Sequence, residues 1–241
     1  MITTIYLIVL SYFLFGAVGF YFINKKKPKA ESSESWIKFI TYFFIINLVF
    51  FSIVIKPVIF SYLTILIAIV GVYEMFNLYK KSNYKVTSVF LIGLLFMLVF
   101  AIGFIAFGRL SENIILFTFL TVSIFDSFSQ ICGQLFGRRK LFPEISPNKT
   151  LGGFIGGAII AVFGALLLRE LFPYPEIKLV TNVSGIILFA FLGDLLTSLY
   201  KRKFQVKDYS RLIPGHGGIL DRFDSLIAAG TWVAFYHLLN F

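Results

Sequence analysis

Residues 198–225 bring together the side chains that bind phosphates and divalent metal ions. Lysine and arginine suit phosphate oxygens, while carboxylates suit a hard cation such as Mg²⁺, which often bridges to phosphate groups. Residues 214–218 read Pro-Gly-His-Gly-Gly, which is typical of a tight turn where the backbone approaches a ligand closely. The charged residues are Lys201, Arg202, Lys203, Lys207, Asp208, Arg211, Asp221, Arg222 and Asp224. The stretch therefore predicts a site for metal and polyphosphate chemistry.

Two further carboxylates lie on apolar segments upstream. On a helix, Asp194, Ser198 and Lys201 fall on a single stripe that points into the charged stretch. A carboxylate is costly at the centre of a bilayer, so we expect Asp126 near the inner end of its helix, facing a wet cavity or a cation. A helix-packing hydrogen bond is the alternative interpretation of Asp126.

Two other polar features leave alternatives open. Glu74 lies near the inner end of an expected span, where a carboxylate either serves function or simply reaches water. Residues 146–150, Ser-Pro-Asn-Lys-Thr, resemble a capped helix start at which N–H groups and Lys149 would receive a phosphate. A plain cap explains the same pentapeptide nearly as well. The glycines of residues 152–157 predict close contact between helices.

The composition is that of a polytopic membrane protein. The chain is 58% hydrophobic and only 14% charged, and it contains 31 Phe. A membrane-spanning helix needs roughly 20 mostly apolar residues. The expected spans are residues 3–23, 39–55, 58–79, 86–107, 113–131, 151–168, 179–200 and 221–239. We therefore expect an all-α fold of about eight transmembrane helices, with an N-terminal region in residues 1–110 and a catalytic region in residues 111–241.

The basic residues predict how the chain is oriented. With the N-terminus outside, all but four of the 22 Lys and Arg fall in cytoplasmic segments. The four outside are Lys56, Arg109, Arg169 and Lys178. Both termini are then extracytoplasmic, and the cytoplasmic loops 132–150 and 201–220 place the polar site at the cytoplasmic ends of the C-terminal helices. This topology and attraction to anionic lipid explain the net charge of +10, so we expect no nucleic-acid binding.

Residues 198–224 resemble the signature of phosphatidate cytidylyltransferases, also called CDP-diglyceride synthetases. The signature positions in this chain are Ser198, Lys201-Arg202, Lys207-Asp208, Pro214, His216-Gly217-Gly218 and Asp221-Arg222-Phe223-Asp224. A second region of that family is similar to Asp126, Gly133, Phe136-Gly137 and residues 146–150. The resemblance covers the C-terminal half through these motifs and the N-terminal half through hydropathy alone.

The resemblance implies an enzyme of phospholipid biosynthesis that transfers CMP from CTP to phosphatidic acid. The products would be CDP-diacylglycerol and pyrophosphate, and Mg²⁺ would be required. The enzyme would lie in a bacterial cytoplasmic membrane, in contact with membrane lipid, with its active site facing the cytoplasm. The resemblance also suggests a homodimer. Because the attacking phosphate of the lipid is already an anion, catalysis needs alignment and charge neutralisation rather than a nucleophilic side chain.

On this basis each polar residue receives an expected role. The expected catalytic residues are Lys201, Asp221, Arg222 and Asp224. The expected metal ligands are Asp126, Asp194, Asp221 and Asp224. The expected substrate-binding residues are Lys149, Ser198, Arg202, Lys207, Arg211, His216, Gly217 and Gly218. The roles of Glu74, Asp208 and the imidazole of His216 remain open between structure and ligand binding.

Departures from the family pattern keep alternative functions open. Tyr200, Ser129-Gln130, Gln134 and Gly152 replace the residues usual at their positions, which leaves another lipid phosphate open as the acceptor. A related polyprenol or lipid kinase is a second alternative. An ion-coupled transporter is a third, but it predicts acids near the bilayer midplane and repeated halves, whereas the acids of this chain crowd one end of their expected spans.

Overall fold

The computed structural model describes residues 2–25 and 28–240, which form a bundle of α-helices and one short β-hairpin. Lys26 and Lys27, which the topology argument counts as cytoplasmic, lie outside these residues. The helices are α1 (Ile2–Asn24), α2 (Lys29–Ile55), α3 (Pro57–Lys81), α4 (Thr87–Phe107), α5 (Glu112–Phe136), α6 (Leu151–Leu167), α7 (Glu176–Lys203) and α8 (Leu220–Asn240). The strands are β1 (Lys140–Phe142) and β2 (Ser146–Thr150), and a short 3₁₀ helix covers Arg169–Leu171.

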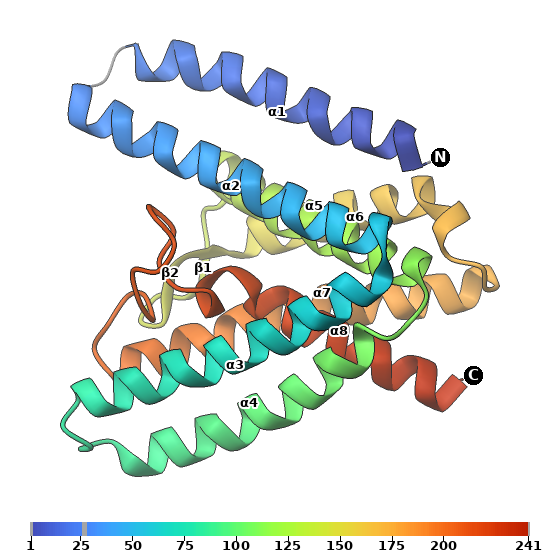
Figure 1. Cartoon of the computed structure of the whole chain (residues 1–241). Coiled ribbons are helices and arrows are strands. Elements are labelled where there is room, and N and C mark those ends of the chain that lie inside the picture. Colours follow the sequence, from blue (N-terminus) through green and yellow to red (C-terminus); the bar gives the residue numbers. More distant parts are fainter. Residues whose placement is uncertain (1, 26–27, 241) are drawn as a thin grey trace.

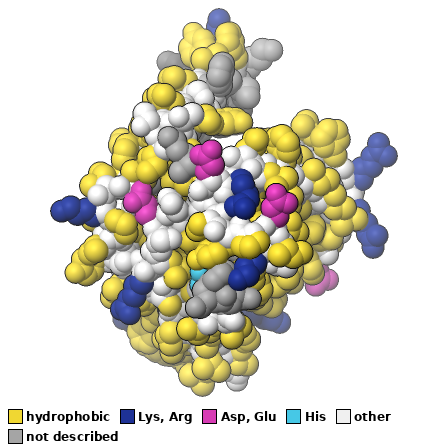
Figure 2. Space-filling model, turned by 90° about the vertical axis from the view of Figure 1, so that its right-hand side faces the viewer, with side chains coloured by type: hydrophobic (Ala, Val, Ile, Leu, Met, Phe, Trp, Pro, Cys, Tyr) yellow, Lys and Arg dark blue, Asp and Glu magenta, His cyan; other side chains and the backbone are white. Residues whose placement is uncertain are grey.

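The helices run alternately up and down, so that their connections gather at two ends of the molecule. Figure 1 shows the α3–α4 turn, the β-hairpin and the α7–α8 loop at one end, and both termini at the other. The end with the termini, viewed in Figure 2, displays scattered acidic and basic side chains among hydrophobic ones. The two termini therefore lie on the same side of the bundle, as the distribution of basic residues predicts.

The prediction of eight spans is supported only in part. Within the described residues, five helices are long and apolar enough to cross a membrane, namely α3, α4, α5, α7 and the Glu31–Ile55 part of α2. Residues Ile2–Val18 of α1 and all of α6 are apolar but shorter, and α8 is absent from both groups. The fold is thus that of an all-α membrane protein, whereas a count of eight spans goes beyond these criteria.

The reason α8 differs from the other helices is its central position. Its residues from Leu220 to Trp232 are almost all buried, and α8 packs against α3, α4, α5 and α7. A helix surrounded by protein need not present an apolar surface to lipid. α8 can therefore carry the buried polar residues Asp221, Asp224, Ser225 and Thr231, which lower its hydropathy.

The β-hairpin corrects the prediction made for residues 146–150. These residues form a strand that pairs antiparallel with β1, and only Thr150 acts as a helix cap. Its side-chain Oγ1 accepts a hydrogen bond from the backbone N–H of Gly153 at 3.1 Å. Thr150 pairs with Lys140 in the hairpin, and the helix starts at the next residue, Leu151. Residues 146–150 alone do not encode this pairing.

The glycines at the start of α6 allow that helix to approach α5 closely, as predicted. A Cβ at Gly157 would lie 2.0 Å from the hydroxyl oxygen of Ser129, and one at Gly156 would lie 2.7 Å from Cys132 Sγ. No real side chain fits at such distances. The close contact fixes α5, and with it Asp126, against α6 and the β-hairpin that carries Lys149.

Candidate active site

Three carboxylates from three helices form the centre of the candidate site. Asp126 comes from α5, Asp194 from α7 and Asp224 from α8. Asp126 lies close enough to both of the others, and Asp194 to Asp224, for their charges to interact. Asp126 is exposed by its accessible surface, and the prediction that it faces a wet cavity or a cation stays a prediction.

Asp194 and Asp224 are oriented by hydroxyl or amide donors. Thr197 Oγ1 donates to Asp224 Oδ2 at 2.7 Å, and the backbone N–H of Ser225 donates to Asp224 Oδ1 at 2.9 Å. The Ser225 side chain lies beside the carboxyl of Asp126. Ser198 Oγ donates to Asp194 Oδ1 at 3.2 Å. These donors fix the directions of the carboxylates and leave further lone pairs for a ligand.

Lys149 is the cation that reaches this group. Its Nζ lies 3.1 Å from Asp194 Oδ2, 3.3 Å from the carbonyl oxygen of Phe191 and 4.6 Å from the centre of the Phe191 ring. The hairpin residue predicted to bind substrate is therefore placed beside the predicted metal ligands. With three carboxylates and one ammonium, the group carries an excess of negative charge.

A magnesium ion fits this donor set. Mg²⁺ takes oxygen ligands and commonly uses one or two protein carboxylates, with water and substrate phosphates completing its coordination. Among the described residues, no group of three or more His, Cys, Asp or Glu side chains is already arranged as a metal site. A pair such as Asp126 and Asp224, together with phosphate oxygens, is sufficient for Mg²⁺, and a divalent cation would neutralise the excess negative charge.

Asp221 occupies a different environment from the other predicted metal ligands. Its Oδ1 pairs with Lys201 Nζ at 2.6 Å, and the side chains of both residues are nearly inaccessible to solvent. Its Oδ2 accepts the backbone N–H groups of Tyr209 and Gly218, each at 2.8 Å. Sequence reasoning grouped Asp221 with Asp224 as a metal ligand, whereas the structure engages both of its oxygens with protein donors.

Glu74 has a defined structural partner, which the sequence did not reveal. Its carboxylate is fully buried and accepts the Ser210 hydroxyl at 2.6 Å and the backbone N–H groups of Ile219 and Leu220 at 3.0 and 2.8 Å. A Cβ at Gly218 would lie 2.4 Å from Glu74 Oε1, so glycine is needed there. Glu74 thus caps the first turn of α8, where an acceptor and a negative charge are favourable.

His216 lies beside α2 rather than among the carboxylates. Its ring stacks on that of Tyr42 with centres 6.3 Å apart, and Tyr42 lies close to Ser127 and Asp126. Burial lowers the pKa of His216 below its usual value of 6.5, and the positive charges of Arg222 and Lys38 lower it further. His216 is therefore neutral at pH 7. Sequence reasoning missed Tyr42, because nothing in its apolar surroundings distinguishes it.

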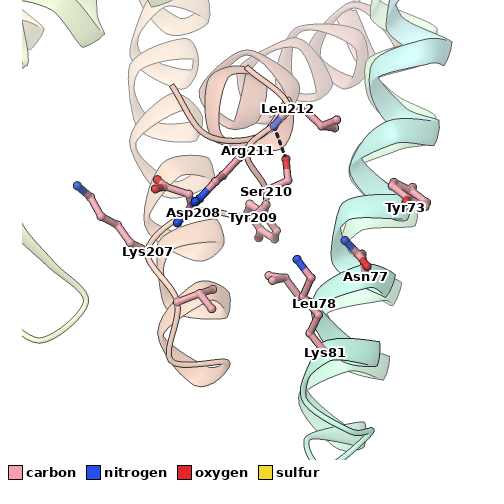
Figure 3. A pocket seen from close by; sticks show the side chains of 11 residues that line it. Tyr73, Asn77, Leu78, Lys81, Lys207, Asp208, Tyr209, Ser210, Arg211 and Leu212 are labelled. Carbon is pink, nitrogen blue, oxygen red and sulfur yellow. Dashed lines mark hydrogen bonds between the residues drawn. The ribbon is translucent and has the colours of Figure 1, made fainter. Parts of the chain in front are cut away.

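The remaining predicted phosphate ligands lie apart from the carboxylates. Arg202 donates to the carbonyl oxygens of Ile145 and Val206 at 3.1 and 2.9 Å, and so ties the β-hairpin to the α7–α8 loop. Lys207 and Arg211 line an open pocket of about 740 Å³ between that loop and α3 (Figure 3). The structure therefore separates the predicted cations: Lys149 lies at the carboxylates, Lys207 and Arg211 lie beside α3, and Arg202 binds backbone carbonyls.

The fold and this geometry define a helical membrane protein with a group of carboxylates and a lysine at one end of its bundle. The chain belongs to the Cytidylyltransferase family, whose model matches residues 88–240. This range contains all of the predicted site residues, while Tyr42 and Glu74 lie outside it.

Curated relatives carry a consistent name. The chain is 47% identical over 115 residues to the phosphatidate cytidylyltransferase of Staphylococcus saprophyticus, which covers 47% of this chain and 44% of that protein. It is 45% identical over 131 residues to that of Staphylococcus epidermidis (52% and 50%), and 47% identical over 104 residues to that of Bacillus subtilis (42% and 39%). The chain spans about half the length of the curated relatives it matches.

Proposed function

We propose that this protein transfers CMP from CTP to phosphatidic acid. The observation that carries the proposal is the group of Asp126, Asp194 and Asp224 beside Lys149, found in a chain of the Cytidylyltransferase family. Relatives named phosphatidate cytidylyltransferase support the choice of acceptor. In this reaction an oxygen of the lipid phosphate bonds to the α-phosphorus of CTP, and the bond from that phosphorus to the β-phosphate oxygen breaks. Pyrophosphate leaves with the bonding electrons.

We assign Asp126, Asp194 and Asp224 to one or more Mg²⁺ ions, the cofactor of this proposal. Bound Mg²⁺ would neutralise charge on the phosphates of both substrates. Lys149 lies at the same carboxylates and would bind a phosphate of CTP. Arg222 is exposed at the start of α8 and would bind another. Because the lipid phosphate is itself the anionic nucleophile, no side chain has to remove a proton.

Lys201 and Asp221 would act by fixing the loop that borders the site. Their buried ion pair and the two backbone amides on Asp221 connect the end of α7 to the turn before α8. Removing either partner leaves an uncompensated buried charge, which is strongly destabilising. Loss of activity on substitution of these residues would therefore report a displaced loop as well as any direct contact with phosphate.

An apolar pocket supports a lipid as the acceptor. It has a volume of about 300 Å³, lies between α4, α7 and α8, and reaches the polar groups of Thr197 and Asp224 at one side. Ile92 and Phe96 of α4, which line it, are more than half exposed on the outer surface of the bundle. An acyl chain entering from the bilayer would place its phosphate toward the carboxylates.

We also propose the orientation in the membrane. The end with the basic loops would face the cytoplasm, where CTP is present, and both termini would lie outside. Placement in a bacterial cytoplasmic membrane is supported by the five apolar helices and by the bacterial relatives. A homodimer remains a prediction from the family resemblance.

The test is a transfer assay with purified protein in detergent, Mg²⁺, phosphatidic acid and CTP labelled on the α-phosphate. Label should appear in the lipid phase with wild-type protein and disappear with Asp224→Asn. Glu144→Gln, which changes an exposed acid in the hairpin turn, is the matched control and should keep activity. Mg²⁺-dependent CTP binding without lipid labelling would indicate another lipid phosphate. In a parallel reaction with CTP labelled on the γ-phosphate, labelled lipid would indicate a kinase. Failure to bind CTP would refute the proposal.

A further inference from the structure

The pocket beside α3 combines cations from two distant parts of the chain. Lys81 comes from the last turn of α3, and Lys207 and Arg211 come from the α7–α8 loop. Figure 3 shows α3, with Asn77 and Lys81, facing the loop that carries Tyr209 and Arg211. We call this feature the basic pocket. Lys81 belongs to none of the motifs discussed above and lies outside residues 88–240.

The basic pocket is separate from the candidate active site. None of Asp126, Lys149, Asp194 and Asp224 lines it. Tyr209 forms the wall between the two: it is buried, its backbone N–H bonds Asp221, and Lys201 Nζ lies 5.4 Å from the centre of its ring. One side of the loop therefore serves the buried ion pair, while the other side lines the basic pocket.

The charges of the basic pocket favour an anion. Its lining contains three cations and the single carboxylate of Asp208. In the part of the chain that the structure describes, Lys81, Lys207 and Arg211 form no salt bridge, and all three are exposed. The positive charges outnumber the single carboxylate in this lining, so an anion bound in the pocket would be attracted to it.

The position of the basic pocket identifies the kind of anion. It lies at the end of α3, a helix apolar enough to span a membrane, and its lining includes the exposed side chains of Tyr73 and Leu212. Tyrosine is enriched where membrane meets water, and basic pockets between helices at the cytoplasmic side bind anionic headgroups. A ligand held here would have a phosphate among the cations and an apolar part along α3.

We propose that the basic pocket binds the phosphate headgroup of an anionic membrane phospholipid, at a site distinct from that of the reacting lipid. Two hydrogen bonds connect the loop that carries Lys207 and Arg211 to the rest of the protein. Ser210, in the same loop, donates to Glu74, and Tyr209 donates to Asp221. A lipid that joins Lys81 to Lys207 and Arg211 therefore stabilises the loop in the conformation that these bonds require.

The experiment measures lipid binding in the absence of CTP, so that its failure is distinct from failure of the proposed function. Phosphatidylglycerol is titrated onto the full chain in a nonionic detergent, and bound lipids are counted by native mass spectrometry. Wild-type protein should retain one phosphatidylglycerol more tightly than phosphatidylcholine. Lys81→Gln should weaken this binding about fivefold, the effect of one cation at a lipid surface, and Lys81→Glu should weaken it further.

Lys80→Gln is the matched control, since Lys80 is an exposed neighbour of equal charge that does not line the basic pocket. It should leave the binding unchanged. Equal losses for Lys80→Gln and Lys81→Gln would show general surface attraction and overturn the proposal. Inorganic phosphate is the second probe: if it competes with phosphatidylglycerol at equal concentration, the ligand is a free phosphate and the lipid assignment is wrong.

Discussion

Two sets of carboxylates lie at the same end of the bundle, but their surroundings differ. Glu74 and Asp221 are buried and accept hydrogen bonds from neighbouring backbone amides, the Ser210 hydroxyl and the Lys201 ammonium. Asp126, Asp194 and Asp224 repel one another, Asp194 and Asp224 accept hydrogen bonds from hydroxyl groups, and the cations Lys149 and Lys201 lie near the set. The first set stabilises the loop, and the second set is the one to which we assign Mg²⁺ in the proposed function. The partners of a carboxylate, rather than its residue type, thus indicate its role.

The largest effect on activity is expected from Asp224→Asn. The substitution keeps the size of the side chain but removes a negative charge where phosphate charge must be neutralised, so the rate of CMP transfer should fall about 10²–10³-fold. The melting temperature should change little, because an amide can still bond Thr197 and the N–H of Ser225. Initial rates and thermal melts on the same samples test this. If Asp224→Asn kept the wild-type rate of CMP transfer, or if it strongly lowered the melting temperature, Asp224 would not differ in role from Glu74 and Asp221.

Glu74→Ala is expected to act on stability first. Three donors lose their acceptor, at about 1 kcal/mol each, so unfolding should become easier by about 3 kcal/mol. Ser210→Ala, which removes one of the three bonds, should cost about 1 kcal/mol. Thermal or denaturant unfolding measures both changes. A stable Glu74→Ala protein that has lost only its response to Mg²⁺ would place Glu74 in the binding set instead.

Lys149→Gln should have a smaller effect, confined to substrate binding. The side chain of Asp194 is 41% exposed, so solvent screens the pair and its loss should barely alter stability. The KM for CTP should rise about tenfold, the effect of one lost ionic contact with phosphate. Lys140→Gln, at an exposed position in the same hairpin, is the control. Equal KM values for the two variants would show that Lys149 does not contact CTP.

The smallest effect concerns pH. The pKa of His216 lies below 6.5 because burial and the nearby Arg222 and Lys38 disfavour its charged form. As pH falls through 6.5, the unfolded chain takes up the proton more readily than the folded one, so stability decreases toward the folded-state pKa. His216→Gln should reduce the loss of melting temperature between about pH 7.5 and 5.5 by about one degree. A larger loss of melting temperature in His216→Gln would mean that folding raises, rather than lowers, the pKa of His216.

Local patterns predicted much of the fold. Apolar runs located the helices, although α2 begins at Lys29, ten residues before the predicted span of 39–55. The basic residues predicted that both termini lie at one end. The prediction for residues 146–150 was wrong in form, because pairing with Lys140–Phe142 converts a predicted helix start into a strand. Hydropathy also predicted that α8 is a span. Among the described residues α8 does not meet the criteria for a spanning helix, because it carries polar residues that are buried within the bundle.

The candidate site was predicted in its residue types but not in its partnerships. The sequence grouped Asp126, Asp194, Asp221 and Asp224 as metal ligands. The structure places Asp126, Asp194 and Asp224 near one another, whereas Asp221 pairs with Lys201. It did not identify the donors Thr197 and Ser225, although each is adjacent in sequence to residues of the site. Serine and threonine are common in such helices, so no local pattern distinguishes these two.

The sequence by itself determined that the chain is a helical membrane protein with acidic and basic residues for phosphate chemistry, because composition and periodicity are local properties. Tertiary structure alone decided which of those residues meet. Glu74 and Leu220 are 146 positions apart, and Lys81 and Arg211 are brought to one pocket only when α3 packs beside the α7–α8 loop. Their partners then completed the division. Glu74 and Asp221 accept hydrogen bonds from the α7–α8 loop, whereas Asp126, Asp194 and the buried Asp224 meet near Lys149.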